Sequence, residues 1–171
     1  MAIRSTRRVV ARLGRLFRRA KRRGLKALRA LVGPPARRGA VKALRAFIER
    51  HAKRRVLVLG DSHMRVFDHW LFLFANPRTK YHVVYVPGGT AIGILNPTSK
   101  SGARERFDLE LASGKWDLVI VGLGEVDTAH ALWRMSRVRG IPIETLTDRA
   151  IASYTTFLDT VRRDHRLIVV S

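Results

Sequence analysis

Ser62 lies in the segment Gly60-Asp61-Ser62-His63, directly after the apolar run Val56-Leu57-Val58-Leu59. The run is short and rich in β-branched residues, which predicts a buried parallel strand. A serine at a strand-to-helix turn stands at the edge of the sheet, where its hydroxyl can attack a carbonyl carbon and its amide can donate to the oxyanion that forms. The placement of Ser62 therefore suits nucleophilic chemistry. The alternative is that Ser62 only caps the next helix, because serine is a preferred N-cap residue.

Glycine and polar residues also follow the next two expected strands, in segments 87–93 and 124–127. In doubly wound parallel sheets, ligands bind beyond the carboxyl ends of the strands, so we expect the three loops to converge on one edge. The side chains expected around that pocket, apart from Ser62, are Asp61, His63, Thr90, Asn96, Glu125 and Asp127.

The elements that must position these loops alternate between strand and helix patterns. Apolar runs at 82–86, 118–122 and 167–170 predict three further strands, and helical patterns lie between them. The clearest helix is expected at 146–163, with Thr145 and Asp148 forming a capping box. The predicted fold is α/β: a doubly wound, flavodoxin-like parallel sheet with helices on both faces, incomplete at its C-terminus.

The segments 60–63, 87–93 and 124–127 form three sequence blocks. In this order over 56–171, they resemble the conserved blocks of the SGNH/GDSL hydrolase family. The resemblance implies an esterase, or an enzyme of acyl or acetyl transfer, acting on a carbohydrate or lipid ester without a cofactor. It makes Ser62 both nucleophile and oxyanion amide donor. It assigns a second oxyanion amide to a glycine of the second block, which is Gly93 or, alternatively, Gly89.

Two departures from the family pattern bear on catalysis. Val126 stands where the family has an asparagine, so that oxyanion donor is missing unless Asn96 or another group replaces it. The family's Asp-x-x-His block, which supplies the acid and base, does not follow the last expected strand, and Asp164-His165 precedes that strand. We interpret the chain as a fragment of a hydrolase domain. The alternative is a non-catalytic SGNH-fold module that binds a glycan.

Simpler interpretations exist for the other candidate residues. The glycines of 87–93 allow tight backbone turns whatever the function of the loop. Asp127 can equally cap a helix that runs through His130 and Trp133. His63 is expected to line the pocket rather than to act on Ser62, because neighbouring side chains on a turn diverge. The remaining histidines are expected at packing or surface positions, and their spacing predicts no metal site.

Residues 1–55 carry 20 of the 34 lysines and arginines against one acid, Glu49, a balance of +19 within a total of +21. Apolar residues recur in this extension at helical spacing, which predicts basic amphipathic helices at 9–32 and 37–51, with Gly33-Pro34-Pro35 between them. We therefore divide the chain into a basic helical extension, 1–55, and an SGNH-like domain, 56–171. The absence of cysteine excludes disulfides and thiolate chemistry.

Three interpretations of the extension remain open. A solvated tail is the simplest, but the apolar periodicity favours peripheral attachment of 9–51 to an anionic membrane. Nucleic-acid binding is less favoured because the sequence contains no base-reading module. No apolar stretch has the length of a signal peptide or of a membrane span, so we expect a cytoplasmic protein attached peripherally to a membrane.

Overall fold

The computed structural model describes residues 34–170, and the chain divides into two compact units, 1–43 and 44–171. The predicted helix at 9–32 lies outside the described residues. The predicted helix at 37–51 is confirmed as α3 (Pro34–His51). It begins earlier than expected because proline suits the first helical turn, where N–H groups have no intrahelical acceptor.

The last turns of α3 are held against the α/β unit by one buried side chain and two ion pairs. Ile48 is 4% exposed. Arg45 Nη2 lies 2.8 Å from Asp68 Oδ1, and Lys80 Nζ lies 2.6 Å from Glu49 Oε2. Residues 44–51 are therefore part of the α/β unit's structure.

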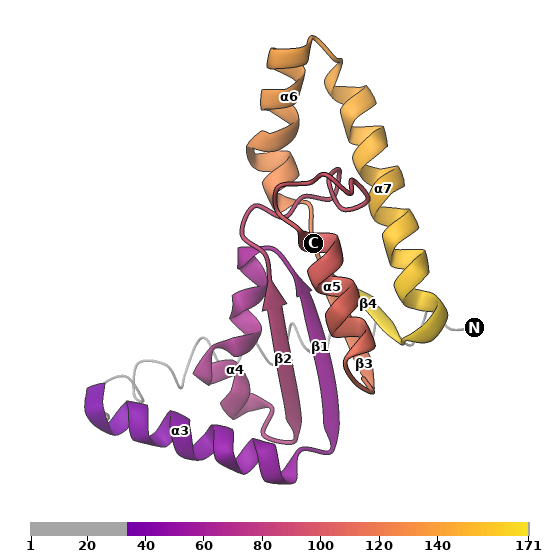
Figure 1. Cartoon of the computed structure of the whole chain (residues 1–171). Coiled ribbons are helices and arrows are strands. Elements are labelled where there is room, and N and C mark those ends of the chain that lie inside the picture. Colours follow the sequence, from indigo (N-terminus) through magenta and orange to yellow (C-terminus); the bar gives the residue numbers. More distant parts are fainter. Residues whose placement is uncertain (1–33, 171) are drawn as a thin grey trace. The chain divides into compact units, whose positions relative to one another are not determined.

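Four parallel strands form one open sheet in the order β2-β1-β3-β4 (Figure 1). All four predicted strands are present, as β1 (Arg54–Gly60), β2 (Thr79–Tyr85), β3 (Leu118–Gly122) and β4 (Leu167–Val169). β1 pairs on one side with β2 and on the other with β3, so that Gly60 lies opposite Tyr85 and Gly122. This order confirms the predicted flavodoxin-like arrangement.

Helical segments connect the strands and cover both faces of the sheet. In chain order they are η1 (Ser62–Asp68), α4 (Trp70–Ala75), α5 (Ala103–Ala112), η2 (Asp127–Ala131), α6 (Leu132–Arg139) and α7 (Ile143–Asp164). None of the described helices is both long and apolar enough to cross a membrane.

Two apolar cores follow from the alternation of side chains along the strands. On one face, Leu57 and Leu59 pack in a cluster with Phe107 of α5 and Phe157 of α7, all completely buried. On the other face, the smaller cluster around Val56 and Val58 contains Met64 of η1. The larger core gathers α5 and α7 on one side, and η1 covers the opposite side.

The predicted helix at 146–163 is confirmed as α7, but its predicted capping box is wrong. The helix begins at Ile143 with Pro142 as its N-cap, so Thr145 and Asp148 already lie within it. Pro142 has φ −54°, and no side chain makes a capping hydrogen bond at this end of the helix. The start of α7 is thus set by proline geometry rather than by reciprocal side-chain caps.

Two glycines at the carboxyl ends of β1 and β3 allow the strands and η1 to meet. A Cβ on Gly60 would overlap the carbonyl oxygen of Gly122, and a Cβ on Gly122 would overlap the Met64 sulfur. Met64 is 4% exposed and packs over this junction. The turn that carries Ser62 therefore depends on the absence of both side chains.

We predict that Gly60→Ala lowers the free energy of unfolding by about 1–3 kcal/mol, the usual cost of overpacking. Gly122→Ala is the matched variant, and its loss should be smaller because the flexible Met64 side chain can move. Denaturant titration followed by circular dichroism measures both losses. A loss at Gly60 equal to or below that at Gly122 would contradict the prediction.

Candidate functional site

The turn after β1 presents Ser62 to solvent. Asp61 is the N-cap of η1: it has extended backbone angles, is 2% exposed, and accepts a 2.9 Å hydrogen bond from the His63 N–H. Ser62 is the first residue of η1 and is exposed. Its N–H has no intrahelical acceptor at that position. The alternative that Ser62 caps the helix is therefore wrong, because Asp61 is the cap.

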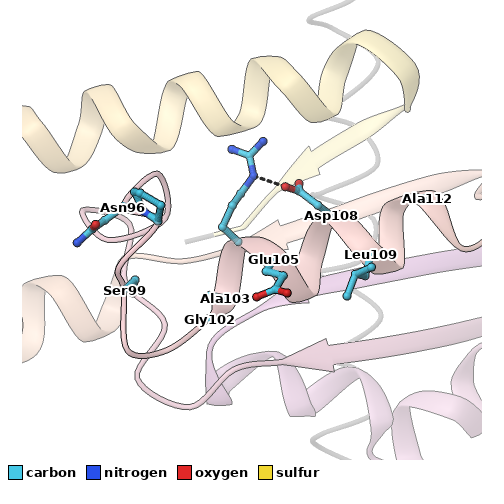
Figure 2. Close-up of a pocket in the computed structure, with 10 residues that line it drawn as sticks. Asn96, Ser99, Gly102, Ala103, Glu105, Asp108, Leu109 and Ala112 are labelled. Atoms are coloured by element: carbon cyan, nitrogen blue, oxygen red, sulfur yellow. Dashed lines mark hydrogen bonds and ion pairs between the residues drawn. The ribbon is translucent and has the colours of Figure 1, made fainter.

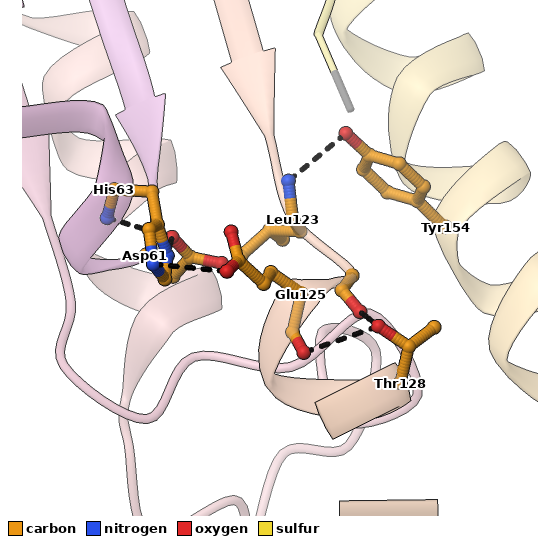
Figure 3. A network of polar contacts seen from close by, with 7 residues as sticks. Asp61, His63, Leu123, Glu125, Thr128 and Tyr154 are labelled. Carbon is orange, nitrogen blue, oxygen red and sulfur yellow. Dashed lines mark hydrogen bonds and ion pairs between the residues drawn. The ribbon is translucent and has the colours of Figure 1, made fainter. Parts of the chain in front are cut away.

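His63 lies between two carboxylates (Figure 3). Its Nδ1 lies 3.0 Å from Asp61 Oδ1, and its Nε2 lies 3.0 Å from Glu125 Oε1. The Asp61 side chain is almost fully buried, whereas those of His63 and Glu125 are more than half exposed. The contact with Glu125 joins the loop after β1 to the loop after β3 at the protein surface. The contact with the buried Asp61 carboxylate orients the imidazole ring from the protein interior.

Backbone hydrogen bonds bring the three predicted loops to one edge of the sheet. Val86 N–H donates to the Gly60 carbonyl at 2.8 Å, and Asp61 N–H donates to the Gly122 carbonyl at 3.2 Å. The first of these bonds fastens the start of the β2 loop to β1, and the second fastens the β1 turn to β3. The convergence expected of a parallel sheet is thus present.

Asp127 joins the β2 and β3 loops from inside the protein. It is 2% exposed, and its two carboxylate oxygens accept the amides of Ala91 at 2.6 Å and Ile92 at 3.1 Å. Such charge-assisted bonds are stronger than neutral ones. Asp127 does not cap η2, whose N-cap is Val126. Its place in the substrate pocket stays a prediction, since the structure directs its carboxylate to backbone amides.

Both glycine amides proposed for the oxyanion already donate within the β2 loop. The Gly93 N–H donates to Thr90 Oγ1 at 3.1 Å, and the Gly89 N–H donates to the Val86 carbonyl at 3.0 Å. Gly93 is partly exposed and Gly89 is buried. To bind an oxyanion, either amide must exchange its present acceptor for the ligand.

Tyr154 of α7 reaches the end of β3, a contact that the sequence did not predict. Its hydroxyl accepts the Leu123 N–H at 3.3 Å (Figure 3). Burial raises the pKa of Tyr154 to about 12, and the negative charge of Asp61 contributes to the increase. The phenol is therefore neutral at physiological pH. The sequence signal for Tyr154 was only its place on the apolar face of α7.

A separate hollow of about 560 Å³ lies between the β2 loop and α5 (Figure 2). Of the predicted pocket residues, Asn96 lines this hollow and Ser62, His63 and Glu125 do not. The Asn96 side-chain oxygen accepts the Thr98 amide and hydroxyl, at 3.0 and 2.9 Å. Asn96 thus stabilises its own turn, and compensation for the missing asparagine at position 126 stays a prediction.

The remaining acid and base candidates do not assemble a triad among the described residues. Asp127 and His130 have the Asp-x-x-His spacing, but the Asp127 carboxylate holds the β2 loop and His130 is exposed. His82 pairs with Glu110 at 2.9 Å, on the outer strand β2. No cluster of three potential metal ligands occurs within residues 34–170.

Comparison of the chain with protein-family models, with curated proteins and with solved structures finds no match. The function of this edge of the sheet must therefore be inferred from its own residues.

We predict that Asp127→Asn destabilises the protein by about 1–3 kcal/mol, because one buried amide loses its acceptor. The amides of Ala91 and Ile92 should also exchange hydrogen faster. Asp159→Asn, at an exposed position of α7, is the matched control and should change stability by less than about 0.5 kcal/mol. Equal effects of the two variants would show that the Asp127 carboxylate does not hold the loop.

Proposed function

We propose that this chain is the catalytic part of an SGNH/GDSL-type serine hydrolase that acts on an acyl or acetyl ester of a carbohydrate or lipid. The Ser62 hydroxyl attacks the ester carbonyl, the alcohol leaves, and water releases the acyl group from the serine. One observation carries the proposal: Ser62 is exposed at the first position of η1, on the edge where the loops after β1, β2 and β3 meet.

The turn geometry supports a nucleophilic role for Ser62. The buried Asp61 carboxylate caps η1 in its place, so the Ser62 hydroxyl is not needed as the cap. Within residues 34–170 the Ser62 side chain makes no hydrogen bond to protein. Its hydroxyl is therefore free to reach a substrate, and its N–H at the helix start can donate to the oxyanion.

The Ser62 hydroxyl needs a base that accepts its proton. A serine hydroxyl is a poor nucleophile at neutral pH without one. His63 is the imidazole beside Ser62 in the chain, and both of its ring nitrogens lie 3.0 Å from carboxylate oxygens. With both nitrogens paired, His63 serves in this proposal as a pocket-lining residue, and the resemblance assigns the base to an Asp-x-x-His block.

A second candidate function is binding without hydrolysis, with the same edge recognising a glycan. It is favoured by the engaged amides of Gly89 and Gly93 and by Val126 at the position of the missing amide side chain. In this function the paired His63 and Glu125 serve as hydrogen-bonding groups for sugar hydroxyls. Attachment to an anionic membrane through 9–51, in a cytoplasmic protein, is compatible with both functions.

We predict that the protein turns over p-nitrophenyl acetate and that Ser62→Ala lowers kcat/KM by at least about 10³-fold, as expected for loss of a nucleophile. This ester suits the site because its leaving group departs without a proton donor. A fluorophosphonate probe should label Ser62, as identified by peptide mass spectrometry.

Ser113→Ala is the matched control, because Ser113 is an exposed serine at the end of α5 whose hydroxyl bonds the Glu110 carbonyl. It should retain full turnover and labelling. Equal rates for wild type and Ser62→Ala would remove Ser62 from the mechanism. A folded protein without turnover that binds an acetylated oligosaccharide would instead establish the binding function.

A further inference from the structure

An exposed stripe on α6 combines aromatic, aliphatic and basic side chains. It consists of Trp133, Arg134, Arg137 and Val138, which occupy adjoining positions on the helix surface because residues three and four apart lie on one face. Trp133 is 57% exposed and Val138 is 74% exposed, and both arginines are exposed. The stripe thus places an exposed aromatic ring and an exposed aliphatic side chain beside two positive charges.

The charge around the stripe has one sign. Between Thr128 and Ile143 the sequence contains three arginines and no aspartate or glutamate. Neither Arg134 nor Arg137 forms an ion pair within the described part of the chain. The stripe therefore presents uncompensated positive charge, whereas surface arginines elsewhere in the unit, such as Arg45 and Arg104, are paired with carboxylates.

The Trp133 side chain is held in its exposed position. Its Nε1–H donates to the Thr128 carbonyl at 3.1 Å, so the polar atom of the ring is satisfied by the protein. The exposed remainder of the ring is apolar. A surface that offers an apolar boundary beside anionic groups fits this combination, because tryptophan favours the membrane interface and arginine pairs with phosphate.

We propose that the α6 stripe docks on an anionic lipid surface, with the two arginines on lipid phosphates and Trp133 and Val138 at the boundary with the acyl chains. A nucleic acid is the less favoured partner because the apolar Val138 side chain would gain nothing from a phosphate backbone. The inference does not depend on the chemistry proposed for Ser62.

Docking of α6 would also orient the candidate site. The helix rises beyond the carboxyl end of the sheet and follows the β3 loop that carries Glu125 (Figure 1). A membrane against the stripe would therefore lie near the edge where Ser62 is exposed. Residues 44–51 lie at the other end of the sheet, where β1 and β2 begin (Figure 1), so α6 alone determines which end of the α/β unit faces the membrane.

The test uses the full chain and vesicles of phosphatidylcholine with phosphatidylglycerol, some carrying brominated acyl chains. The Trp133 contribution to emission is the difference between wild type and Trp133→Phe. We expect that contribution to shift to the blue and to be quenched by brominated lipid in vesicle-bound protein. Arg134→Gln/Arg137→Gln should weaken docking about 25-fold, at about fivefold for each charge.

Arg162→Gln/Arg163→Gln is the matched control, because it removes the same charge from exposed positions in the last turn of α7. It should leave Trp133 quenching unchanged. The proposal is overturned if Trp133 is not quenched on bound protein, if the protein does not bind the vesicles, or if both double variants lose quenching equally. A response of Trp133 to polyuridylate but not to vesicles would overturn it in favour of nucleic acid.

Discussion

The buried carboxylate of Asp127 is the charge on which the arrangement of the candidate site depends. A carboxylate that is 2% exposed is tolerated only when hydrogen bonds replace its hydration, and the amides of Ala91 and Ile92 supply them. The same bonds fix the loop after β2 against the loop after β3. Asp61, after the neighbouring strand β1, is stabilised in the same way: its buried carboxylate is hydrogen-bonded to the backbone amide and the ring of His63. Two buried carboxylates thus hold the loops at this edge of the sheet by accepting backbone amides.

The strands and the positions of the loops could be predicted because they follow from local patterns. Apolar runs flanked by glycine define β1 and β3, and the rules of parallel sheets then place their carboxyl ends together. Even the close approach of Gly60 and Gly122 has a sequence signal, since both glycines end their strands. The same reasoning failed at the start of α7. Thr145 and Asp148 have the residue types and spacing of a capping box, but the helix begins earlier, after Pro142.

The pairing of the polar side chains could not be predicted in the same way. Asp61 and His63 are near neighbours in the chain, but the distance from His63 to Glu125 depends on how β1 and β3 pack. Tyr154 comes from α7, 31 residues later in the sequence, and contacts Leu123 because α7 packs against the sheet. Asp127 was predicted near the pocket, yet nothing in its neighbours indicated that its partners would be the amides of the β2 loop.

The two glycines proposed as oxyanion donors are not equivalent in this arrangement. A hydrogen bond to an oxyanion is roughly twice as strong as one between neutral groups, so an amide with a neutral acceptor gains by exchanging it. Gly89 and Gly93 both have neutral acceptors, whereas the amides of Ala91 and Ile92 are already bound to a carboxylate. Gly89 is buried and Gly93 is partly exposed, so Gly93 is the more accessible of the two residues. The exchange of Thr90 for an oxyanion at Gly93 is therefore the smaller rearrangement and favours Gly93 as the second donor.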